Sequence, residues 1–88
     1  MTAKEYKEKA NEILQEYIKE KNKINPNEFA TIERCCELED EFLHLVFFFN
    51  PNMPMLDEMK SNSLKYRCNV IKYIERFIHY LNEYCQNE

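Results

Sequence analysis

Four basic side chains gather in one stretch of the sequence where they could bind an anion. Lys60, Lys65, Arg67 and Lys72 lie around the expected start of the last helix. A helix N-terminus favours negative charge because its N–H groups are unpaired and its dipole end is positive. Tyr66 lies in the same turns and could stack on a base. These residues predict a site for a small phosphorylated ligand, with Lys65, Tyr66 and Arg67 as contacts.

Arg67 interrupts a row of apolar residues. The other members of the row, at alternating spacings of three and four, are Leu64, Ile71, Ile74, Ile78, Leu81 and Cys85. Such spacing places side chains on one face of a helix. A guanidinium on that face must be paired or must bind something. Two outcomes are open. In the first, Arg67 forms a salt bridge to an acid of the preceding helix or lies at an exposed end of the row. In the second, it binds an anionic ligand.

No pattern typical of a catalytic or metal site is found in the sequence. The sequence contains no glycine, so it cannot form the glycine-rich phosphate-binding loops of nucleotide hydrolases. The four cysteines are Cys35, Cys36, Cys68 and Cys85. They include no CxxC pair, and we expect them to be reduced, small core residues. His44 and His79 are far apart, so we expect no metal and no cofactor. We therefore expect a binding protein and not an enzyme.

Charge limits the range of partners. Residues 24–59 carry one arginine against eight acids, and the net charge is −4. We interpret the acidic run at residues 37–41 as a solvated helix face. No basic face runs the length of the chain, so we expect no long nucleic acid. No stretch of about eighteen uncharged apolar residues occurs, so we expect no membrane span and a cytoplasmic location.

Prolines among asparagines divide one expected domain, residues 1–88, into three helices. Thr2 and Glu5 form a capping box that starts the first helix, at about residues 2–22. Asn25-Pro26-Asn27-Glu28 repeats the start signal for a second helix at about 26–49. A short turn at residues 56–59 could precede the last helix. Ser61 or Ser63 then caps this helix, which spans about residues 61–86.

Apolar rows on the two long later helices are broad. The second helix has two rows. One row contains Phe29, Ile32, Cys36, Leu43 and Val46, and the neighbouring row contains Cys35, Leu38, Phe42, Leu45 and Phe49. The last helix adds Tyr66, Tyr73 and Tyr80, and Val70, Phe77 and Tyr84. These rows outnumber the faces that one small chain can bury. We therefore expect a homo-oligomer, with an even copy number built from twofold pairs.

The fold class that follows is all-α. No period-two strand pattern occurs, and the short turn at residues 50–54 predicts an antiparallel hairpin of the second and last helices. The N-terminal helix packs across this hairpin or reaches a neighbouring copy. In an oligomer, pockets between copies could combine the basic group with first-helix residues such as Tyr6, Lys7, Tyr17 or Lys21.

The sequence also resembles a known family. Arg67-Cys68-Asn69-Val70-Ile71-Lys72-Tyr73-Ile74-Glu75, followed by Tyr80 and Asn82, is similar to the final helix of the phage anti-CBASS cyclic-oligonucleotide sponges. Their helical hairpin is shared with a sponge that blocks Thoeris defence. A weaker similarity covers residues 24–46, and the two segments together span over half of the chain.

The resemblance implies a phage-encoded hexamer that sequesters cyclic dinucleotides or trinucleotides, without cleaving them, and so blocks host CBASS defence. Arg67 is the one site residue carried over directly. Tyr6 or Tyr17 could stand for the family's N-terminal tyrosine, and Arg34 could replace its lysine on the first hairpin helix. The alternative function is a helical interaction module or inhibitor that docks exposed aromatic rows onto a host enzyme.

Overall fold

The computed structural model describes residues 2–23 and 28–86, apart from the side chains of residues 28–32, 85 and 86. This part of the chain is all-helical, without strands, so the expected fold class is confirmed there. The helices are α1 (Ala3–Lys21), α2 (Glu28–Phe49), α3 (Pro54–Ser61), α4 (Ser63–Cys68) and α5 (Val70–Gln86). The predicted cap at residues 25–28 and the predicted core side chains Phe29, Ile32 and Cys85 lie outside the described residues.

The predicted start of α1 is confirmed. The Thr2 hydroxyl accepts a hydrogen bond from the backbone N–H of Glu5 at 3.2 Å, and the Glu5 carboxylate completes the capping box. Asn22 ends the helix, close to the expected residue. Its buried face, which contains Ala10, Ile13, Leu14 and Tyr17, packs against both α2 and α5.

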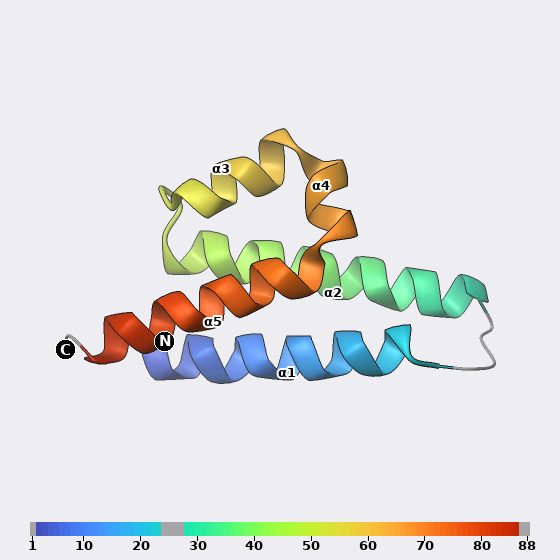
Figure 1. Cartoon of the computed structure of the whole chain (residues 1–88), viewed down its shortest axis with the longest axis horizontal. Helices are drawn as coiled ribbons and strands as arrows, with labels where there is room; N and C mark the ends of the chain where they lie inside the picture. The colour runs from blue at the N-terminus through green and yellow to red at the C-terminus, as the bar shows by residue number, and fades with distance from the viewer. Residues whose placement is uncertain (1, 24–27, 87–88) are drawn as a thin grey trace.

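The helices are arranged differently from the expected hairpin. Figure 1 shows α2 and α5 running in the same general direction, with α1 in the opposite direction beside them. The turn after α2 leads into α3, because Pro54 fits the first position of a new helix. The eight residues of α3 then run back above α2 (Figure 1). The expected antiparallel pair of the second and last helices is therefore not found in the described part of the chain.

Two asparagines divide the last segment into separate helices. Asn62 caps α4, since its side-chain oxygen accepts a hydrogen bond from the Lys65 N–H at 3.2 Å. Asn69 has a non-helical backbone and its side-chain amide donates to the Lys65 carbonyl at 2.9 Å. Asparagine competes with helix geometry through such local bonds. The predictions of a serine cap and of one helix over residues 61–86 were therefore wrong.

The extra helices let one chain bury most of its apolar rows. Val70, Tyr73, Ile74 and Phe77 are all buried, whereas Leu64, expected in the same row as Ile74, is 73% exposed. The row fails at Leu64 because the helix does not continue through Asn69. The large apolar side chains that stay exposed among the described residues are Phe47, Phe48, Leu64, Tyr80 and Tyr84.

Some expectations for single residues also change. Cys35 is buried as expected, but Cys36 and Cys68 are exposed, and all three are free thiols. His44 and His79 are exposed. No helix in the described residues is both long enough and apolar enough to cross a bilayer.

Candidate functional site

The short helix α4 is held on α2 by a buried tyrosine. Tyr66 is 3% exposed, and its hydroxyl donates to the backbone carbonyl of Glu39 at 2.7 Å. Its ring stacks on Phe42 and meets Tyr73 edge-on. Tyr66 is therefore an anchor in the core, and its ring is not available to stack on a base in this conformation.

Arg67, the next residue, forms an ion pair with a buried carboxylate. Its Nη1 donates to Oε1 of Glu39 at 2.6 Å, and its Nη2 lies 3.7 Å from Oδ1 of Asp40. The other oxygen of Glu39 accepts a hydrogen bond from the Tyr17 hydroxyl at 3.1 Å. The Glu39 side chain is only 7% exposed, so protein groups replace the water it has lost. Helices α1, α2 and α4 therefore meet at one carboxylate.

This contact confirms one of the two outcomes left open for Arg67. The guanidinium is paired with an acid of the preceding helix, as the salt-bridge alternative predicts. The Arg67 side chain nevertheless stays 46% exposed, so the pairing leaves part of the guanidinium in contact with solvent.

The contacts and the burial around Glu39 shift the pKa values of several side chains. The hydrogen bond to Glu39 raises the pKa of Arg67, which keeps this side chain charged. Burial and the Glu39 carboxylate raise the pKa of Tyr17, and burial is the main cause of the raised pKa of Tyr66. Burial likewise raises the pKa of the Cys35 thiol, which makes it a poor nucleophile.

The exposed part of Arg67 borders an open groove of about 710 Å³ between the end of α1 and the junction of α4 with α5. The lining residues are Tyr17, Lys21, Arg67, Cys68, Asn69, Val70, Ile71, Lys72 and Glu75. Three of them are cations and one is an acid. The Lys21 ammonium lies 5.4 Å from the centre of the Tyr17 ring. We call this the Arg67 groove. Its charge suits an anion, and its volume is in the range of small-ligand sites.

The other residues predicted to bind ligand do not line this groove. Lys65 pairs with Glu58 of α3 at 3.2 Å. Arg34 pairs with Glu16 of α1 and with Glu37 on its own helix, α2. Tyr6, near the start of α1, packs edge-on against Phe49, and Lys7 is half-buried beside it in the sequence. The structure therefore does not bring the six predicted residues together within one chain.

Glu39 is the important residue that the sequence analysis missed. A signal for it exists, because Cys36, Glu39 and Leu43 are spaced by three and four residues and so belong to one row of the helix. Glu39 interrupts the apolar row of α2 as Arg67 interrupts the expected row of the last segment. Lys21 and Lys72 were considered as possible contacts, but only the fold shows that they border one groove with Arg67.

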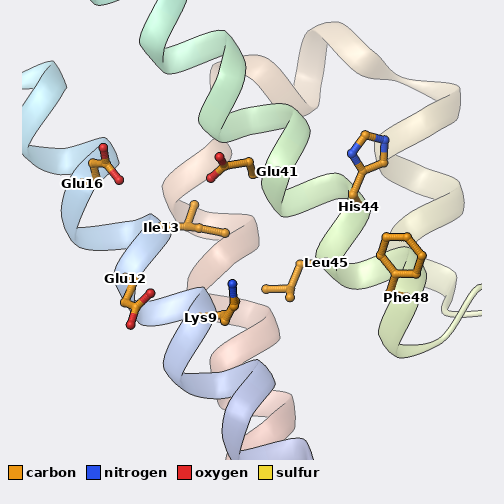
Figure 2. Close-up of a pocket in the computed structure, with 8 residues that line it drawn as sticks. All are labelled: Lys9, Glu12, Ile13, Glu16, Glu41, His44, Leu45 and Phe48. Atoms are coloured by element: carbon orange, nitrogen blue, oxygen red, sulfur yellow. The ribbon is translucent and has the colours of Figure 1, made fainter. Parts of the chain in front are cut away.

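A second groove, of about 470 Å³, lies between α1 and α2 (Figure 2). It is lined by Lys9, Glu12, Ile13, Glu16, Glu41, His44, Leu45 and Phe48. Figure 2 shows Ile13 and Leu45 pointing toward one another from the two helices. We call it the α1–α2 groove. Its charged residues are mostly acidic, so it is not suited to a phosphate.

Among the described residues, no group of three or more histidine, cysteine, aspartate or glutamate side chains could hold a metal ion. Comparisons with protein-family models, with curated proteins and with solved structures find no match to the chain.

Proposed function

We propose that this chain is a non-catalytic binding protein that holds the phosphates of a cyclic oligonucleotide in the Arg67 groove. The observation that carries the proposal is the gathering of Lys21, Arg67 and Lys72 around one open groove. This gathering is notable because the chain as a whole has a net charge of −4. Cations placed in this way form charge-assisted hydrogen bonds with phosphate oxygens.

The roles within the groove follow from which cations already have partners. Arg67 is paired with Glu39, so Lys21 and Lys72, both exposed, make the main phosphate contacts. Arg67 contributes through the part of its guanidinium that remains exposed. The proposed site therefore keeps Arg67 from the resemblance and replaces Lys65, Tyr66, Arg34, Tyr6 and Lys7 by two lysines.

The resemblance of residues 67–75 is the reason for naming cyclic dinucleotides or trinucleotides as the ligand. On this proposal the chain is a phage-encoded immune-evasion protein, acting in the host cytoplasm. It removes a second messenger from solution and so blocks CBASS defence. Sequestration requires only affinity and a sufficient number of copies, and no bond is broken.

We also propose that the chain assembles with copies of itself, with a hexamer as the family resemblance implies. Among the described residues, five large apolar side chains remain exposed, and Phe48 and Leu64 are exposed by 70% and 73%. Burying such side chains against another copy removes apolar area from water, at about 25 cal/mol per Å².

Calorimetric titration with a panel of cyclic dinucleotides and trinucleotides tests the proposed function. The wild-type chain is expected to bind at least one of them at micromolar concentration or below, and chromatography should recover the ligand intact. If no member of the panel binds, the proposal is wrong. A ligand recovered as linear product would show that the chain is an enzyme.

A second candidate function is an interaction module that docks onto a host enzyme. The observation that favours it is the same exposure of Phe48 and Leu64, since apolar anchors are typical of protein interfaces. A single partner bound in fixed stoichiometry without a nucleotide would support it, provided that Phe48→Asp abolishes the complex.

A further inference from the structure

The α1–α2 groove has the features of a site for an apolar side chain flanked by positive charge. Ile13 and Leu45 are both buried and point toward one another between α1 and α2 (Figure 2), and Phe48, which is 70% exposed, also lines the groove. Glu12, Glu16 and Glu41 line it together with one lysine. Arg34 pairs with Glu16 and lies 4.0 Å from Glu41, so the acids exceed the cations at this groove by one. An occupant that matches this groove presents an apolar tip with cations beside it.

The same chain has an exposed apolar side chain of this kind on the short helix α4. Leu64 at the start of α4 is 73% exposed, the most exposed of the large apolar side chains described. Lys60, near the end of α3, lies four residues before Leu64 in the sequence, and Lys65 follows Leu64 directly; both lysines are exposed. Lys65 is 3.2 Å from Glu58, and the Lys60 ammonium lies 5.1 Å from the centre of the Phe47 ring.

We propose that Leu64 of one copy inserts into the α1–α2 groove of another copy. The leucine packs between Ile13, Leu45 and Phe48, and the two lysines face the acidic rim. This inference rests on the self-association proposed above and names the two surfaces that meet. It pairs the two most exposed apolar side chains of the described residues, and it matches their surrounding charges.

The two surfaces lie on different helices, so each copy can offer both at once. Contacts that join unlike surfaces can close into a ring when the rotation between copies permits it. None of the residues that line the Arg67 groove is among those named for either surface.

Native mass measurement on two single variants tests the inference. Leu64→Asp removes the tip and Phe48→Asp places a charge on the groove wall; both positions are exposed, so circular dichroism should remain that of the wild type. Each variant alone is expected to be a single chain under conditions in which the wild type is assembled. Tyr84→Asp, at an exposed aromatic residue on α5, is the matched control and should assemble as the wild type does.

Mixing the two variants gives the sharper result. The Leu64→Asp chain still has an intact groove and the Phe48→Asp chain still has its leucine, so an equal mixture should form pairs. If the mixture stays single, or if either variant assembles like the wild type, the assigned surfaces are wrong while self-association stands. A wild type that is a single chain at all concentrations overturns self-association and this inference together, without affecting the ligand proposal.

Discussion

The contact of Arg67 with Glu39, together with the buried Tyr66, holds α4 on α2. Both residues interrupt apolar rows, and each supplies the partner that the other needs. The Glu39 carboxylate is 7% exposed and Asp40, also near Arg67, is 60% exposed. Exposed pairs contribute little to stability, whereas a hydrogen bond between charged groups at a buried atom contributes more.

Replacing Glu39 should therefore cost far more than replacing Asp40. Glu39→Gln keeps the size of the side chain but removes the charge that pairs with Arg67. The free energy of unfolding should fall by about 1–2 kcal/mol, measured by urea denaturation at pH 7. Asp40→Asn, the matched control, should change it by less than about 0.5 kcal/mol. Equal effects of the two substitutions would mean that Arg67 is not held by the buried carboxylate.

The buried tyrosines predict a loss of stability at alkaline pH. The pKa of Tyr66 is raised in the folded chain, so its stabilising effect is complete below the unfolded pKa of about 10 and declines above it. Tyr66→Phe removes this titration together with the hydrogen bond to the Glu39 carbonyl. The variant should be less stable at pH 7 by about 1 kcal/mol. Its free energy of unfolding, measured with urea, should also decline less steeply between pH 9 and 11 than that of the wild type.

Tyr84→Phe, at a tyrosine that is 43% exposed, is the control for this experiment. It should leave the alkaline slope of the wild type unchanged. A Tyr66→Phe slope as steep as that of the wild type would show that Tyr66 does not account for the pH dependence.

At the scale of the helices, local signals predicted α1 and the end of α2 well. The capping box of Thr2 and Glu5 is a short-range pattern, and Pro51 and Pro54 exclude a continuous helix. The divisions at Asn62 and Asn69 were not predicted, because asparagine is only moderately unfavourable in a helix and the apolar spacing runs across both. Long-range contacts accompany the division, because Tyr66 and Arg67 of the separate helix α4 both bind Glu39 of α2.

The identity of the α4 cap can be tested directly. Asn62→Ala removes the oxygen that accepts from the Lys65 N–H, and should lower the free energy of unfolding by about 1 kcal/mol. Ser61→Ala and Ser63→Ala, at the two caps expected from the sequence, should each change it by only a few tenths. A larger loss at either serine than at Asn62 would contradict the cap assignment. Urea unfolding at pH 7 measures all three.

For the whole molecule, the sequence indicated more apolar surface than one chain could bury, and the fold removes most of that excess. Residues that the heptad spacing places around one long helix are instead divided between α4 and α5, and their buried members pack in the core with residues of α1, α2 and α3. The argument for assembly now depends on a few exposed side chains, with Phe48 and Leu64 foremost. The argument for ligand binding is separate from it, since the Arg67 groove lies within one chain.

The measurement that tests the central claim most directly is calorimetric binding of a cyclic oligonucleotide to two double variants of equal charge. Lys21→Ala with Lys72→Ala removes two cations of the Arg67 groove, and Lys4→Ala with Lys19→Ala removes two exposed cations of α1 that do not line it. The first variant should bind at least about tenfold more weakly than the wild type, since each charged contact is worth about 1.5–3 kcal/mol. The second should bind within about twofold of the wild type. Equal weakening in both, or none in the first, would contradict the account.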